Sequence, residues 1–418
     1  MNSKQRVYAF FWIFGLVNNV LYVVILSAAV DIVGPKVPKT LVLLMDITPS
    51  LLIKVTAPFF IKSIPYTMRI YALIALSCIG MIFVSGKSLL LCMIGIAMAS
   101  VSSGFGEVSF LQLSHFFEEN ALNGWSSGTG GAGIVGSSVY MLLTSIFKLP
   151  IRLSLLSFTI LPFAFLLYFK LDTTQIEYDS ISSSGEETLI RSSHSNALQT
   201  DTFNESIRLS KTEEQNIFVS SIDHFKSTCV NLKALVVPYM LPLSSVYLFE
   251  YLINQAVSPT LLFPLDSRGL PPFFNKYRDM YVTYGTLYQL GVFISRSLAH
   301  KFRMHNLYFL SALQGLNLVL TILQAWIYIV HTPWPIMILI FYEGLLGGSS
   351  YVNTFLNVLE EVDMDKREFS LGAVSIADSL GVFIAALVGL GLEPTICNHQ
   401  VSTGRPWCRM ELKATEKF

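Results

Sequence analysis

Five carboxylates stand inside or at the edge of apolar runs that are long enough to cross a lipid bilayer. They are Asp46, Glu107, Glu250, Glu343 and Asp378. A charged side chain at membrane depth is costly, and proteins that keep one there use it mainly for a solute pathway, a proton relay or a binding site. The five residues therefore indicate a membrane protein with a polar interior.

Glu250 and Glu343 are the strongest candidates for chemistry, because both lie well inside their apolar runs. A carboxylate at that depth can exchange protons with whichever compartment its site faces, so we expect these two residues to be proton or cation carriers. Glu107 is a weaker candidate, because it lies near the end of its predicted span.

Basic residues accompany the acids. Lys54 follows Asp46 by two helical turns. The two residues could form an ion pair within one helix, or each side chain could reach the membrane interface separately. Either explanation is as good as a functional role. Arg296 either anchors the cytosolic end of its helix or belongs to the site. Asp378, with Ser375 nearby, could face a neighbouring helix.

Uncharged polar residues recur at helical spacing beside these charges. Positions i, i+3, i+4 and i+7 share one helix face, which places Tyr247 and Asn254 on the face of Glu250. Similar stripes occur in the first, fourth and tenth spans, and in the tenth the stripe starts at Glu343. We expect the site to be shaped by Asn18, Asn19, Tyr247, Asn254 and Asn353. For the Asn, Ser and Gly residues, hydrogen bonding between helices remains the simpler explanation.

The composition is that of a polytopic membrane protein. Only 13% of the residues are charged and 52% are hydrophobic, whereas soluble domains have about 25% charged residues. The mean hydropathy is +0.55. The formal net charge is zero, which gives no support for a nucleic-acid partner.

We expect eleven membrane spans, whose ends are marked by Pro, Gly and charged residues. The first is too long and too uninterrupted for a cleaved signal peptide. The predicted spans are 8–30, 41–61, 69–86, 88–108, 124–147, 151–170, 236–263, 280–299, 306–330, 335–358 and 369–391.

A polar stretch divides these spans into six and five. It is rich in Ser, Glu, Asp and Asn, and we expect a flexible cytosolic loop. The predicted parts are an N-terminal six-helix bundle at 1–170, the loop at 171–233, a C-terminal five-helix bundle at 234–391 and a polar tail at 392–418. This all-α layout is that of a major-facilitator-type transporter. In that fold the first, fourth, seventh and tenth helices line the central cavity, and these are the spans with polar stripes.

Other chemistry finds little support. GTGGAG at 128–133 matches a dinucleotide-binding pattern, but no strand precedes it, so a small-residue face for helix packing is the better interpretation. The five cysteines form no CxxC and no cluster with metal-ligand spacing. No nucleophile–base pair is visible. We therefore expect no metal, no cofactor and no enzyme.

Several long blocks resemble battenin, the Batten-disease membrane protein, and its fungal relatives in particular. The resemblance covers nearly the whole chain except the central loop and the tail. The blocks are NNVLYVVILSAAVDI (18–32), SSGFGEVSFLQLSHFF (102–117), WSSGTGGAG (125–133), YLFEYLINQ (247–255), RDMYVTYGTLYQLGVFISRS (278–297) and FYEGLLGGSSYVNTFLN (341–357).

The resemblance implies a major-facilitator-like protein of the lysosomal or vacuolar membrane. In fungi it implies vacuolar pH homeostasis and transport of basic amino acids, chiefly arginine, into the vacuole. In animals it implies lysosomal export of glycerophosphodiesters and a role in trafficking. The family positions that carry over are Glu107, Glu250, Asn254, Arg296 and Glu343.

The chain departs from the animal members at its C-terminus. Animal battenins resemble prenylated proteins with a terminal CaaX box, whereas Cys408 is not placed for that modification. With eleven spans, Cys397 and Cys408 would face the lumen and could form a disulfide. The central loop contains a glycosylation sequon at Asn204 and a sequence similar to an acidic-dileucine sorting signal at 186–190.

The leading hypothesis is a vacuolar transporter that couples a small polar solute to protons. Its buried carboxylates outnumber Lys54 and Arg296, which favours a cationic solute. An anionic glycerophosphodiester would instead need both of those cations in the cavity. The alternative class is a non-transporting regulator that acts on a proton pump or on membrane trafficking through its loops.

Overall fold

The computed structural model describes residues 3–28, 39–86, 88–171, 226–265, 269–272, 274, 277–299 and 301–408. Most of the predicted central loop, including its sequon and sorting sequence, and the end of the predicted tail lie outside the described residues. Met1–Phe165 and Leu235–Phe418 together form one compact unit, and Leu166–Ala234 form a second.

The first half of the chain forms six apolar helical segments that match the first six predicted spans closely. They are α1 (Ser3–Ser27), α3 (Lys39–Phe60), α4 (Tyr66–Val84), α5 (Leu89–Ser114), α6 (Glu118–Met141) and α7 (Ile151–Ser157), the last continued by a 3₁₀ segment, Phe158–Lys170.

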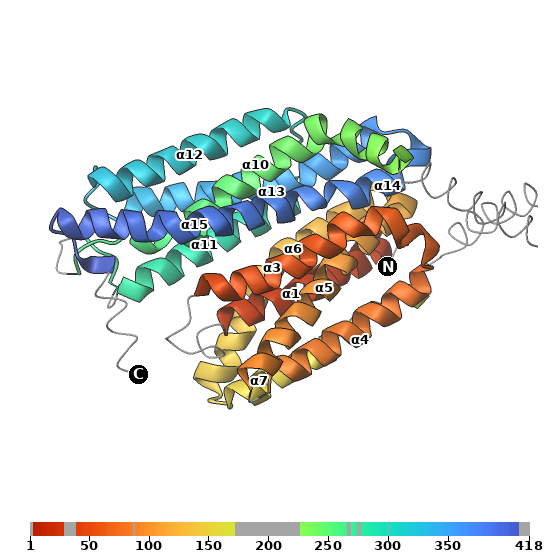
Figure 1. The fold of residues 1–418 in the computed structure, drawn as a ribbon, viewed down its shortest axis with the longest axis horizontal. Helices are drawn as coiled ribbons and strands as arrows, with labels where there is room; N and C mark the ends of the chain where they lie inside the picture. The colour runs from red at the N-terminus through yellow and green to blue at the C-terminus, as the bar shows by residue number, and fades with distance from the viewer. Residues whose placement is uncertain are drawn as a thin grey trace, which may run out of the picture. The chain divides into compact units, whose positions relative to one another are not determined.

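The second half follows the other five predicted spans. Its helices are α10 (Leu241–Leu252), α11 (Tyr277–Leu298), α12 (Leu307–Ile327), α13 (Trp334–Glu361), α14 (Met364–Val374) and α15 (Ile376–Ser402). One π-helical turn, Val236–Met240, precedes α10, and a second, Ile253–Val257, follows it. In Figure 1, α1 and α3–α7 group together and α10–α15 group together.

Nine helical stretches of the described residues are long and apolar enough to cross a membrane. One of them, Leu89–Thr144, contains both α5 and α6, which are separated where Glu118 takes a φ of 54°. The helix α11 is outside this set, because Tyr, Gln and Arg side chains lower its hydropathy. With α5 and α6 counted apart and α11 added, the helices account for all eleven predicted spans.

Several predicted helix boundaries are wrong. The seventh span was expected to begin at 236, after a loop at 171–233, but its helical stretch begins at Lys226. The fifth was expected to begin at 124, but α6 begins at Glu118. The fourth span was expected to end at 108, but α5 continues to Ser114, so Glu107 is inside the helix. The eleventh was expected to end at 391, but α15 continues to Ser402. Its last turns are held by tertiary contacts, because Gln400 donates to two carbonyl groups, of Thr260 and Ala325, and the ring of His399 stacks on Trp326.

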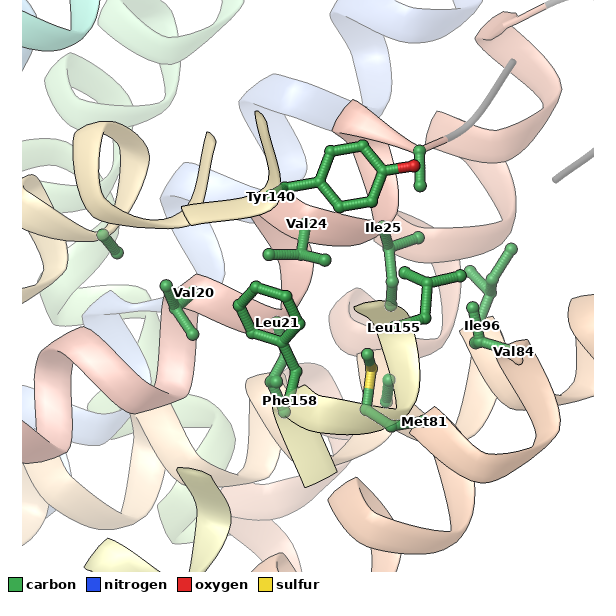
Figure 2. Packing of buried hydrophobic residues seen from close by; sticks show 13 residues of the cluster. Val20, Leu21, Val24, Ile25, Met81, Val84, Ile96, Tyr140, Leu155 and Phe158 are labelled. Atoms are coloured by element: carbon green, nitrogen blue, oxygen red, sulfur yellow. The ribbon is translucent and has the colours of Figure 1, made fainter. Parts of the chain in front are cut away.

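The core of the first half is a cluster of aliphatic and aromatic side chains from α1, α4, α5, α6 and α7 and from the segment that follows α7 (Figure 2). The glycines of α6 let α1 approach closely, because a Cβ at Gly128 would overlap the carbonyl oxygen of Trp12. Gly15 of α1 faces the carbonyl of Trp125 in the same way. The interpretation of residues 128–133 as a packing face is therefore confirmed, as expected for membrane helices, which associate through small residues.

The core of the second half is largely aromatic and aliphatic and includes Phe263, Tyr284, Ile336, Ile340 and Ile396. A disulfide joins Cys397 near the end of α15 to Cys408, which confirms the predicted pairing. Because disulfides persist in oxidising compartments, this bond agrees with a luminal position for the end of α15.

Hydrogen bonds join the two halves toward one end of the helices. Trp125 Nε1 donates to the Tyr351 hydroxyl at 3.1 Å, and the Ser127 and Ser297 hydroxyls lie 2.9 Å apart. Ser127 also accepts a bond from Trp12 in the third turn of α1, so these contacts lie nearer the end at which α1 begins. The two halves are therefore closed against each other on the side of the N-terminus.

Candidate functional site

A cavity of about 110 Å³ lies between the two halves. Its walls come from α1, α3, α5, α10, α11, α13 and α15, and they are mainly polar. The lining residues are Asn19, Tyr22, Asp46, Ile47, Ser50, Lys54, Ser100, Ser103, Glu107, Tyr247, Tyr251, Arg296, Tyr351, Asp378, Ser379 and Val382. The expectation that the first, fourth, seventh and tenth spans line the cavity agrees with this set, but α3, α11 and α15 contribute as well.

Lys54 is the centre of an ion cluster that spans both halves. Its Nζ lies 2.7 Å from Glu107 Oε2 on α5 and 3.0 Å from Asp378 Oδ1 on α15, and it donates to the Ser379 hydroxyl at 2.7 Å. The Lys54 side chain is only 1% exposed. Because a buried charge is tolerated when it is paired and hydrogen-bonded, these contacts account for a lysine at this depth.

Asp46 also lines the cavity, but it does not pair with Lys54. Within the described residues, no basic nitrogen lies within 4.0 Å of its carboxylate. The interpretation of Asp46 and Lys54 as an ion pair within one helix is therefore wrong. The physical reason is distance, since eight residues of α-helix span about 12 Å.

Arg296 points into the same cavity and is held by neutral groups. Its Nη1 donates to Thr129 Oγ1 at 2.7 Å and its Nη2 to the Tyr247 hydroxyl at 2.8 Å, while its Cζ lies 4.2 Å from the centre of the Tyr351 ring. Its Nε is buried and has no hydrogen-bond partner. No carboxylate of the described residues forms a salt bridge with it. Arg296 is thus part of the cavity wall and not an anchor at the end of its helix.

The cavity combines an excess of acid with aromatic surface. If all are ionised, three carboxylates, Asp46, Glu107 and Asp378, face two cations, Lys54 and Arg296, for a formal charge of −1 (2 − 3). Four tyrosines complete the wall. They are Tyr22, Tyr247, Tyr251 and Tyr351. Such a site can bind a polar solute that has both an anionic and a cationic group, because aromatic faces and carboxylates attract cations.

Glu250 and Glu343 lie outside this cavity, as a second buried pair within the second half. Glu250 is 2% exposed and accepts a hydrogen bond from the Tyr288 hydroxyl. Glu343 is 0% exposed and accepts one from Asn254 Nδ2 at 2.8 Å. One carboxylate oxygen of each residue is buried without a hydrogen-bond partner.

The remaining predicted residues serve mainly as contacts between helices. Asn18 donates to Asn19 and to the carbonyl of Ser103. Asn353 accepts from Arg303 and from the backbone of Met304. No residue of the predicted polar face of α13 is among the cavity-lining residues. The residue of α13 that lines the cavity is Tyr351.

Among the lining residues that were not predicted, two form hydrogen bonds with the ion cluster. Ser379 is uncharged and follows Asp378 directly in the sequence. Its position next to Asp378 is the one sequence feature that suggests its contact with Lys54. Tyr351 lies on another face of α13 than Glu343 and donates to Glu107 at 2.9 Å. A tyrosine in an apolar helix gives no signal that separates this role from ordinary packing. The described residues contain no group of three His, Cys, Asp or Glu that could hold a metal ion.

Comparison with known proteins gives a consistent result. The family described as CLN3 protein matches residues 9–399 of the chain. Protein BTN1 of Saccharomyces cerevisiae is 58% identical over 416 residues, which cover 98% of this chain and 100% of the relative. Protein BTN1 of Kluyveromyces lactis is 56% identical over 411 residues, with the same coverage of both chains.

Among solved structures, the fucose:proton symporter FucP of E. coli is similar to this chain. The two superpose with a TM-score of 0.53 at 14% sequence identity, over 99% of this chain and 95% of the symporter. At this identity the similarity concerns the fold alone. The chain therefore belongs to the CLN3 protein (battenin) family, and it is a multi-pass membrane protein with a major-facilitator-like fold.

Proposed function

We propose that this protein is a proton-linked transporter of the vacuolar membrane, and that it moves a small polar solute whose anionic group binds Arg296 in the central cavity. Within that class the preferred solute is a glycerophosphodiester. The vacuolar location, and an influence on vacuolar pH, follow from the family resemblance and from proton-linked flux.

The observation that carries this proposal is the unequal pairing of the two cavity cations. Lys54 has two carboxylates within 3.0 Å, whereas Arg296 has only hydroxyl groups and an aromatic ring. A guanidinium presents donors in a fork that matches a carboxylate or a phosphate. An anionic group is therefore the partner that Arg296 lacks.

The sequence alone favoured a cationic solute, and the cavity changes that preference. Both Lys54 and Arg296 line it, which is the arrangement that an anionic solute requires. A phosphodiester would be held by Arg296 and by the hydroxyls of Tyr247 and Thr129, which already surround the guanidinium.

A basic amino acid is the second candidate. Asp46 faces the cavity without a basic partner in the described part of the chain, so it offers a contact for an ammonium or guanidinium group. Arginine would then bind through its carboxylate at Arg296 and through a cationic end at Asp46. Both solutes have an anionic group for Arg296, so a transport measurement has to separate them.

The test is uptake by purified protein in sealed liposomes with an imposed pH gradient. Glycerophosphodiesters, arginine and lysine are compared for the wild type and for Arg296→Gln. The expected result is uptake of a glycerophosphodiester that falls at least tenfold in Arg296→Gln. Arg303→Gln is the matched control, because Arg303 pairs with Glu360 and is not among the cavity-lining residues.

Other outcomes select the alternatives. Uptake of arginine alone would replace the preferred solute by the second candidate. No uptake of any of these solutes by folded protein would favour a regulator of a proton pump or of trafficking, and deletion of residues 180–225 would then be the informative variant.

A further inference from the structure

We infer that Glu250 and Glu343 together hold one small monovalent cation, a proton or a sodium ion, at a site inside the second half that is separate from the solute cavity. The binding of this cation stands on its own geometry. Its coupling to solute binding at Arg296 rests on the proposed function.

The two carboxylates lie on neighbouring helices, α10 and α13, about one helical turn apart. Gly347 of α13 provides the space for Glu250, because a Cβ at that position would overlap Glu250 Oε2. Gly347 lies one turn after Glu343 on the same helix, and residues four apart share a face. Glu250 therefore lies against the part of α13 from which Glu343 projects.

Each carboxylate has one bonded and one free oxygen. Tyr288 of α11 donates to Glu250 Oε1, and Asn254, one turn after Glu250, donates to Glu343 Oε1. Oε2 of both residues is buried with no hydrogen-bond partner. A buried oxygen without a partner costs free energy, so two such oxygens on adjacent helices favour a bound cation that both carboxylates can reach.

Charge leads to the same conclusion. Within the described residues, no Lys, Arg or His nitrogen lies within 4.0 Å of either carboxylate. Two neighbouring carboxylates at 2% and 0% exposure cannot both remain charged without a cation. One proton shared between the pair, or one sodium ion bound by their oxygens, removes the conflict.

A third helix, α12, supplies a further buried oxygen about one turn from Glu343. Asn317 of α12 is buried and donates to the carbonyl of Leu339, one turn before Glu343, and its Oδ1 has no partner. The other titratable or charged groups that act on Glu250 are tyrosines and Arg296. The tyrosines are Tyr247, Tyr251 and Tyr288.

Two helices connect this pair to the cavity. On α10, Tyr247 is bonded to Arg296 and lies one turn before Glu250. On α11, Tyr288 is bonded to Glu250 and lies two turns before Arg296. An anion at Arg296 and a cation at the pair would therefore stabilise each other, and such coupling is reciprocal.

The experiment measures the cation without any solute. Infrared spectra of the purified full chain report the C=O stretch of a protonated carboxylic acid, and thermal unfolding is recorded against sodium concentration. If the pair shares a proton, a carboxylic band is present in the wild type, shifts in Glu343→Gln and in Glu250→Gln, and is lost in the double variant. Glu119→Gln is the control, because Glu119 is exposed at the start of α6.

If the pair binds a sodium ion, the carboxylic band is absent. Sodium then raises the unfolding temperature of the wild type but not that of the two Gln variants. If a Gln variant does not fold, Tyr288→Phe keeps both acids and should shift the band or weaken the sodium effect. Absence of both the band and the sodium effect would overturn the inference. A cation signal with no solute uptake would leave the site in place and reject only the proposed function.

Discussion

Two groups of buried carboxylates in this protein have similar burial and different partners. Glu107 and Asp378 share the ammonium of Lys54, and the cluster connects α3 and α5 of the first half to α15 of the second. Glu250 and Glu343 lie within the second half and have only neutral donors, Tyr288 and Asn254. The first group has its cation built into the chain, whereas the second needs one from outside.

This difference separates two roles. A fixed ion cluster across the cavity joins the two halves. If the protein transports by alternating access, as the proposed function requires, this cluster must open when the halves move apart. A pair without a fixed cation can take one up and release it. The comparison predicts that the first group matters most for stability and the second for ion dependence.

Removal of Lys54 should have the largest effect on stability. Lys54→Met leaves Glu107 and Asp378 buried without a cation, and breaking a buried pair in this way costs about 3–5 kcal/mol. The measurement is thermal unfolding of the purified protein in detergent. The triple variant Lys54→Met, Glu107→Gln, Asp378→Asn should recover much of the loss, because no unpaired charge remains. An unfolding temperature equal to that of the wild type for the single variant would contradict the role of the cluster.

Gly347→Ala should have an intermediate effect. The added methyl group takes the space of Glu250 Oε2, and overpacking of this kind costs about 1–3 kcal/mol. We also expect it to remove the proton or sodium dependence of unfolding, because Glu250 is displaced from Glu343. The matched control is Gly285→Ala, since nothing lies within 4 Å of a Cβ at that position. If both alanine variants behave alike, Gly347 does not position the pair.

Glu250→Gln should have the smallest effect on stability. A neutral amide of the same shape replaces a group that is already neutralised by its cation, so we expect a change of about 1 kcal/mol or less, in contrast with Lys54→Met. The informative readout is the slope of the unfolding temperature against pH or sodium, which should be reduced relative to the wild type. A loss as large as that of Lys54→Met would mean that the two groups of acids are structurally equivalent.

The comparison also shows what a sequence can reveal about this fold. The helices could be predicted because apolar runs of about 20 residues and their polar breaks are local features. All five acids were identified for the same reason, since each interrupts an apolar run. Even α11 was predicted, as the span 280–299, despite its many polar side chains.

The partners of these acids could not be predicted. Lys54 and Asp378 are 324 positions apart, and their contact depends on how α15 packs against α3. Asp46 was the nearer candidate in sequence but is too far along the helix. The face of α13 that bears Glu343 is directed into its own half and not into the cavity, and helical periodicity does not decide between those two directions.

The central claim is that solute binding and cation coupling occupy separate sites, and one measurement tests it directly. Two kinds of liposome are compared, one with wild-type protein and one with the double variant Glu250→Gln, Glu343→Gln. Each is assayed with the same solute for exchange across the membrane without a gradient, and for accumulation driven by a pH or sodium gradient. The account predicts that the double variant retains exchange and loses gradient-driven accumulation. Equal loss of both processes, or retention of both, would contradict it.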